Sequence, residues 1–257
     1  MRQSAVMAGL AAVAISAAGC QSDERPAAAP ATLSPTPVAT SATPSPAPSS
    51  TPRRHRRPRP TSVATVVVPA FRYTTSGVTA AQLGKSWHHG CPVAPSSLTN
   101  VTLSFWGFDH RAHAGTLVVN TTVVPAVVSA FRSMYDARFP IRRMQPIAAY
   151  GGDDDKSMAA DNTSAFNCRL AVSDGPPSWS MHAYGEAIDI NTLENPYRLN
   201  GTVRPPAGAT YMDRSNVRPG MIVAGGAAAR AFGAVRWGWG GNWSSTPDYQ
   251  HFSANGR

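Results

Sequence analysis

Residues 21–62 consist mostly of Pro, Ala, Ser and Thr and contain almost no large apolar side chains. Such a segment buries too little surface to offset the conformational entropy lost on folding, so we expect a disordered linker. The chain that follows, residues 63–257, is about 190 residues long, which is enough for one hydrophobic core. The sequence therefore predicts a single folded domain at 63–257 behind a long linker.

More than half of the net charge of +9 lies in residues 1–60. This segment holds seven of the 23 Lys and Arg residues but only two of the 14 acidic residues. Nucleic-acid binding needs a basic face on the folded part of a protein, usually with a recognisable motif, and we find neither. A basic extracytoplasmic arm that meets anionic lipid or wall polymer fits the pattern better.

Residues 1–20 carry Arg2 and then an apolar run that is too short for a stable transmembrane helix, so we expect a signal peptide. The segment 16–20, Ser-Ala-Ala-Gly-Cys, resembles a bacterial lipobox, although Ala17 stands where Leu is usual. An ordinary signal peptide that is cleaved nearby is the alternative. We expect lipidation of Cys20 and a membrane lipoprotein whose linker extends on the order of 100 Å into the cell wall.

The pattern of apolar residues predicts both helices and strands within the domain. Apolar side chains between positions 124 and 135 recur at helical spacing, with Pro125 tolerated in the first turn. We expect a second helix at 227–232. Runs of β-forming residues predict strands at 103–108, 116–119, 144–150 and 162–170. The acidic segment 151–156 matches no EF-hand loop, and we expect it to be a solvated loop.

Two segments in the C-terminal third offer metal ligands. The first contains His182 and Asp189, and the second contains His251 with Asp248 three residues before it. Two imidazoles and a carboxylate with an open position for water form the usual arrangement of a catalytic zinc site. A His and an Asp seven residues apart also occur by chance, so the first segment alone is a weak signal. The Gly- and Trp-rich stretch 237–243 either forms one wall of a cleft or belongs to the core.

The full pattern resembles a known family. Residues 180–189 have the form Ser-x-His-x-x-Gly-x-Ala-x-Asp, which resembles the signature of zinc D-alanyl-D-alanine carboxypeptidases of the VanY type. That family includes phage L-alanyl-D-glutamate endolysins. Residues 238–243 and 248–252 are similar to the second motif of the endolysin-like branch, and residues 166–169 also look like that branch. The resemblance covers residues 85–257.

This resemblance implies a small α+β domain whose central antiparallel sheet carries one Zn²⁺. By position, His182, Asp189 and His251 match the zinc ligands and Asp248 matches the catalytic base. Arg169 matches the arginine that meets the substrate or the transition state. The implied reaction is hydrolysis of stem-peptide bonds next to D-amino acids in peptidoglycan, by a monomer acting either as a D,D-carboxypeptidase or as an L-alanyl-D-glutamate-type endopeptidase.

A different class of function is the alternative: a non-catalytic, metal-containing lipoprotein that binds the cell wall. Such a binder has no need for a carboxylate at position 248, and this chain has one. Glu186 falls on a variable position of the motif and receives no role.

Two cysteines fall in the predicted domain, Cys91 and Cys168. In an exported protein they are candidates for a disulfide, and a role as metal ligand is the alternative. We expect the adjacent His88 and His89 to have surface or packing roles.

Overall fold

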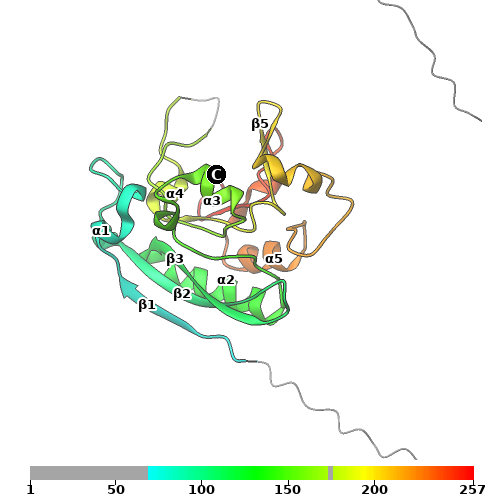
Figure 1. The fold of residues 1–257 in the computed structure, drawn as a ribbon, viewed down its shortest axis with the longest axis horizontal. Coiled ribbons are helices and arrows are strands. Elements are labelled where there is room, and N and C mark those ends of the chain that lie inside the picture. Colours follow the sequence, from blue (N-terminus) through cyan, green and yellow to red (C-terminus); the bar gives the residue numbers. More distant parts are fainter. Residues whose placement is uncertain (1–68, 173–175) are drawn as a thin grey trace, which may run out of the picture. The chain divides into compact units, whose positions relative to one another are not determined.

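The computed structural model describes residues 69–172 and 176–257 (Figure 1). The predicted signal peptide, Cys20 and the linker at 21–62 lie outside these residues. Within the described part of the chain, no helix has the length and apolarity needed to cross a lipid bilayer.

A long β-hairpin forms the centre of the first sheet. Its strands β2 (Leu98–Trp106) and β3 (Ala112–Asn120) pair antiparallel, and β1 (Tyr73–Gly77) adds to the outer edge of β2. Buried and half-buried positions alternate along β2, as the two-residue period of a strand requires. The two strands predicted here exist, but β3 begins at 112, inside the segment that separates the two predicted strands.

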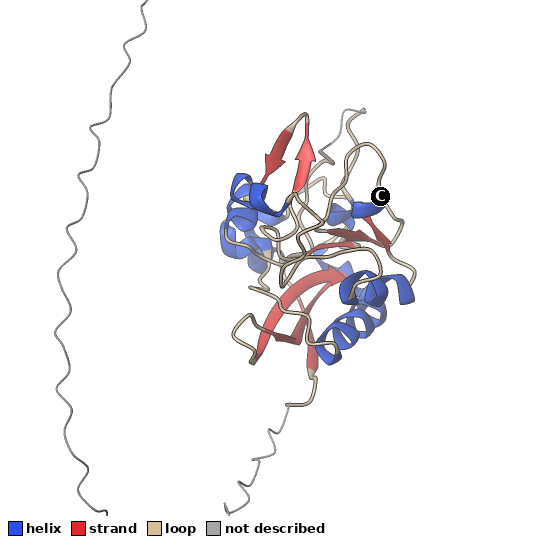
Figure 2. Ribbon diagram, turned by 90° about the vertical axis from the view of Figure 1, so that its right-hand side faces the viewer, coloured by secondary structure: helices blue, strands red, loops and turns tan. Residues whose placement is uncertain are grey.

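The helix α2 (Val124–Asp136) covers the buried face of this sheet, on which Val101, Leu103 and Leu117 lie. It confirms the helix predicted from apolar spacing, with Pro125 in its first turn. Its buried side chains also meet α5 (Ala227–Ala234), the second predicted helix, through the edge-to-face pair Phe131–Phe232. Figure 2 shows both helices beside the strands.

A second, smaller sheet contains the segments that carry the candidate ligands. Its strands β4 (Ala187–Asp189), β8 (His251–Ser253) and β7 (Gly238–Trp239) are antiparallel in the order β4-β8-β7. Phe252 anchors this sheet to the main core by stacking on Phe232 at 4.1 Å between ring centroids. The predicted α+β class with antiparallel sheets is therefore confirmed. The remaining helices and strands are α1 (Ala80–Leu83), α3 (Asp154–Ala159), α4 (Met181–Tyr184), β5 (Tyr197–Leu199) and β6 (Thr202–Arg204).

The strands predicted at 144–150 and 162–170 are wrong. Residues 147–150 form a 3-10 helix, and 162–170 makes only isolated bridges. The backbones of the two segments pair only at Met144 and Thr163. Beside this bridge, the buried side chain of Asn162 accepts from the Gln145 amide at 3.0 Å and donates to the Gln145 carbonyl at 2.9 Å, an alternative to strand pairing that Asn side chains offer.

A buried pair of carboxyl groups lies next to the second sheet. Glu194 and Asp161 are both almost fully buried, and Arg142 lies 3.5 Å from the first and 3.3 Å from the second. Burial raises the pKa of Glu194 to about 8, and Asp161 adds to the rise while Arg142 opposes it. Glu194 is therefore protonated in the folded protein at neutral pH.

The raised pKa of Glu194 predicts how stability changes with pH. Between pH 4.5 and about 8 the folded state binds more protons at this site than the unfolded state, so the free energy of unfolding falls as pH rises. In a Glu194→Gln variant this loss should be absent, and its melting temperature should decline by several degrees less than the wild type's across the same window. Equal slopes in thermal melts of the two proteins would contradict the assignment.

Candidate metal centre

His182 is placed by a single turn of helix with a serine cap at its start and a glycine cap at its end. The Ser180 hydroxyl caps α4 by accepting from the His182 amide at 3.2 Å. Gly185 ends the turn with φ +70°, and a Cβ there would lie 2.6 Å from the Asn120 amide nitrogen. The Ser and Gly of the 180–189 motif therefore fix the orientation of this turn against the end of β3.

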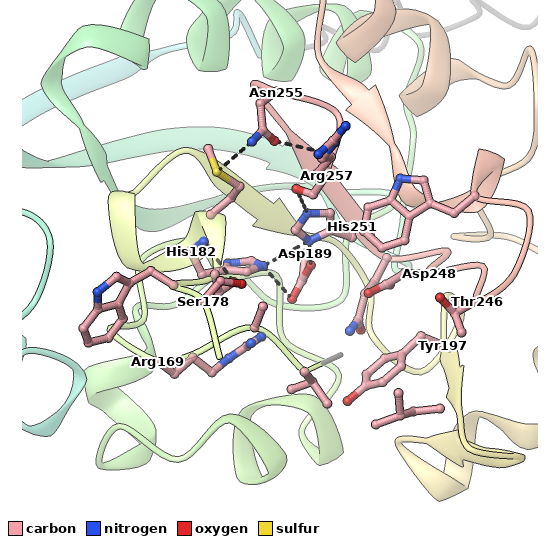
Figure 3. A pocket seen from close by; sticks show the side chains of 18 of the residues that line it. Arg169, Ser178, His182, Asp189, Tyr197, Thr246, Asp248, His251, Asn255 and Arg257 are labelled. Carbon is pink, nitrogen blue, oxygen red and sulfur yellow. Dashed lines mark hydrogen bonds and ion pairs between the residues drawn. The ribbon is translucent and has the colours of Figure 1, made fainter. Parts of the chain in front are cut away.

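Strand pairing places the other two candidate ligands. Asp189 and His251 lie directly opposite each other in the register of β4 and β8. The Asp189 carboxylate is 3.2 Å from His182 Nε2 through Oδ2 and 3.2 Å from His251 Nδ1 through Oδ1. The two imidazole nitrogens are also 3.2 Å apart, so the three side chains converge on one point (Figure 3). All three are buried.

In each imidazole, the ring nitrogen that faces away from Asp189 lies within hydrogen-bonding distance of a main-chain oxygen. His182 Nδ1 lies 2.6 Å from the Ala165 carbonyl, and His251 Nε2 lies 3.2 Å from the Arg257 carbonyl. Each contact requires a proton on that nitrogen, which leaves a lone pair on the nitrogen that faces Asp189. Two lone pairs and a carboxylate then point at one another. Such a cluster of acceptors is stable only with a cation at its centre, either a proton or a metal ion.

The spacing of the three ligand atoms fits zinc. Bonds of about 2.0–2.1 Å in a tetrahedron put neighbouring ligand atoms about 3.3–3.4 Å apart. The two imidazole nitrogens are 3.2 Å apart, and each lies 3.2 Å from a different oxygen of Asp189, so these distances are close to this value. The donor set of two nitrogens and a carboxylate is also one that zinc prefers. These residues therefore form a candidate metal triad with room for a fourth ligand.

The charge state of the triad follows from its burial and mutual contacts. Burial alone would lower the pKa of His182, but the Asp189 carboxylate overcomes this and raises it. Conversely, burial opposes ionisation of Asp189, and the charge and hydrogen bond of His182 hold the pKa of this carboxyl well below its usual range. Without metal, the site is therefore an ion pair that holds the proton a metal must replace.

Asp248 lies beside the triad with a free oxygen atom. The residue is half-buried, and its Oδ1 atom is fully buried and has no hydrogen-bond partner. Burial and the negative charge of Asp189 raise its pKa to about 7. The main chain of Asp248 packs closely against Gly240, where a Cβ would lie 2.6 Å from the Asp248 carbonyl oxygen. A carboxyl group with a pKa near neutrality is suited to accept and return a proton.

A cavity of about 290 Å³ opens over these residues. Arg169 reaches into it from the side opposite Asp248, and Tyr197 and Trp243 also line it (Figure 3). Nearby carboxylates, Asp154 first, raise the pKa of Arg169 against the opposing effect of burial, so its positive charge is maintained. The structure thus brings together the three predicted ligands, the predicted base and the predicted arginine.

Cys91 and Cys168 form a disulfide. With His88 they make up the second group of potential metal ligands that lie within 4.8 Å of one another in the described residues. Because both sulfur atoms are in the disulfide, they are not free thiolates, and metal binding by this group would require reduction. The triad around Asp189 is the group that is ready to bind a metal.

Several residues of the site carry no recognisable signal in the sequence. Tyr197 of β5, which pairs with Asp248 through an isolated β-bridge, is one of them. Trp243, whose ring lies 5.4 Å from that of His251, instead belongs to the Trp-rich stretch that the sequence had indicated. The carbonyls of Ala165 and Arg257 could not be found because main-chain groups leave no pattern in side-chain chemistry. Of the tryptophans at 237–243, the first two are buried in the core and only Trp243 lines the cavity.

Comparison with known families agrees with this geometry. Residues 174–254 match the model of a family described as D-alanyl-D-alanine carboxypeptidase. The match covers less than half of the chain and includes the triad and Asp248, while Arg169 and the disulfide precede it. Neither the curated proteins nor the solved structures give a significant match. The family match supports a metallopeptidase in general.

The protonated state of the metal-free triad predicts that zinc and protons compete. Zinc affinity should rise with pH, because the proton on His182, whose pKa is raised, must leave when the metal binds. Chelator competition at about pH 5.5 and about pH 7.5 measures this. His182→Ala should abolish tight binding, whereas His113→Ala, which changes an exposed histidine paired with Asp109, should not. A zinc affinity that does not change with pH would contradict the assignment.

Proposed function

We propose that the chain is a zinc-dependent peptidoglycan peptidase that hydrolyses stem-peptide bonds next to D-amino acids. The observation that carries the proposal is the position of Asp248, a half-buried residue that lines the cavity next to the candidate metal triad and whose Oδ1 has no hydrogen-bond partner. The family match over 174–254 supports the same chemistry. The resemblance to the VanY type and its endolysin-like branch is part of this proposal.

His182, Asp189 and His251 would hold the zinc, which when bound supplies Lewis acidity and lowers the pKa of a water ligand to about 7. Asp248 accepts a proton from the attacking water and passes it to the leaving amine. Its pKa of about 7 in the metal-free protein reflects burial and Asp189. A dication nearby would shift that pKa downward, so that Asp248 is ionised at neutral pH.

Arg169 provides the positive charge that the substrate or the developing oxyanion meets. Its guanidinium lies in the cavity with the triad and Asp248. The cavity is lined by residues of the described stretches 169–172 and 176–180, and by β5, which contributes Tyr197 and Leu199. A stem peptide lying between these stretches and β5 would pass over the triad.

We propose that the enzyme works outside the cytoplasm as a lipoprotein anchored through Cys20. The support is the lipobox-like segment and the Pro-rich residues that follow it. The partners of the chain are then peptidoglycan stem peptides and, through the lipid anchor, the membrane.

An Asp248→Asn variant separates catalysis from metal binding. It keeps the side-chain shape but loses the basic oxygen, so muropeptide cleavage should fall on the order of 10²–10⁴-fold. Zinc content should be unchanged, because Asp248 is not one of the triad. Asp213→Asn, at an exposed site away from the cavity, is the matched control.

Mass spectrometry of muropeptides digested by the wild-type protein distinguishes the two proposed peptidase activities. Loss of a single terminal Ala identifies a carboxypeptidase, and split stems identify an endopeptidase. Zinc binding without any turnover on purified sacculi would contradict the proposal and favour the non-catalytic wall-binding alternative.

A further inference from the structure

Three consecutive acidic residues at the start of α3 have three different environments. Asp153 caps the helix by accepting from the Lys156 amide at 3.0 Å. Asp155 is largely exposed and lies 3.5 Å from Arg204. Asp154 instead turns inward, and its Oδ2 lies 2.8 Å from Nε of Arg169 in an ion pair whose alignment is not that of a hydrogen bond. The expectation that 151–156 is a solvated loop is therefore wrong for 154–156, which begin α3, and Asp154 is turned toward Arg169.

The contact between Asp154 and Arg169 is supported from several sides. Asn167 donates to the other oxygen of Asp154 at 3.4 Å. The main chain of Arg169 is fixed by the amide of Ser180, which donates to its carbonyl at 3.1 Å, and by the disulfide at Cys168. The backbone is thus held in place, and the remaining freedom of Arg169 lies in its long side chain.

That side chain has competing partners within the site. The charges of Asp189 and Asp248 also act on the Arg169 guanidinium, although less strongly than that of Asp154. If Asp154 did not hold Nε, the guanidinium would be drawn toward these two carboxylates. It would then neutralise the base and compete with the metal, and it would no longer be available to a substrate.

We propose that Asp154 is a positioning residue that holds Arg169 in the cavity and keeps it away from Asp189 and Asp248. Asp154 does not line the cavity itself, so it acts through Arg169 and not on the substrate. This inference rests on the proposed peptidase function, in which Arg169 meets the negative charge of the substrate.

A double-mutant cycle on muropeptide cleavage tests the proposal. Asp154→Asn should lower kcat/KM on the order of 10²-fold, as expected when a substrate-positioning group is displaced by about 1 Å. Asp155→Asn, in the same helical turn, should match the wild type. In an Arg169→Ala background, Asp154→Asn should have no further effect. Zinc content should be the same in all four variants, and Asp154→Glu should recover part of the activity.

A second readout does not depend on turnover. In the zinc-loaded wild type, the nitrogen-15 chemical shift of Arg169 Nε should reflect the Asp154 charge 2.8 Å away, so Asp154→Asn should move this signal while Asp155→Asn leaves it in place. If the wild type is inactive but the Nε signal responds to Asp154 alone, the proposed function fails while the contact stands. Wild-type cleavage with additive losses from Asp154→Asn and Arg169→Ala, or with no loss from Asp154→Asn, would overturn the inference. Thermal melts identify any variant that has not folded, in which case Asp154→Ala, which also removes the carboxylate, replaces Asp154→Asn in the comparison.

Discussion

The organisation of the site depends on one antiparallel strand pair. Because Asp189 and His251 face each other across β4 and β8, a shift of one residue in register would send one of the two side chains to the opposite face. The stacking of Phe252 on Phe232 opposes such a shift by fixing β8 in the hydrophobic core. His182 then needs only one capped helical turn to complete the triad.

The chemistry of the cavity depends on how its charges are separated. Carboxylates at 189 and 248 and the guanidinium of Arg169 share a small, partly buried space in which charges interact strongly. The carbonyls behind His182 and His251 set which nitrogens face the metal position, and Asp154 draws Arg169 to the other side. Groups outside the cavity therefore set the orientation of the imidazoles and the position of the Arg169 guanidinium inside it.

The sequence predicted the parts of this structure that depend on local patterns. The apolar spacing indicated α2, and the β-formers indicated that β2 and β3 exist although not where they begin. The resemblance of 180–189 and 248–252 to family motifs pointed to the candidate ligands and the candidate base. The sequence prediction failed at 144–150 and 162–170, where the two segments share one isolated bridge at Met144 and Thr163, and where a contact joins distant segments. Asp154 lies 15 residues before Arg169 in an acidic run, and only the fold shows which of its three carboxylates turns inward.

X-ray absorption spectroscopy of the zinc-loaded protein tests the central claim most directly, because it reports the atoms bound to the metal. Binding at His182, Asp189 and His251 predicts only nitrogen and oxygen neighbours, at about 2.0–2.1 Å, with the multiple scattering typical of two imidazoles. A sulfur neighbour at about 2.3 Å would place the metal at Cys91 and Cys168 instead. Coordination by oxygen atoms alone would also contradict the assignment of the triad.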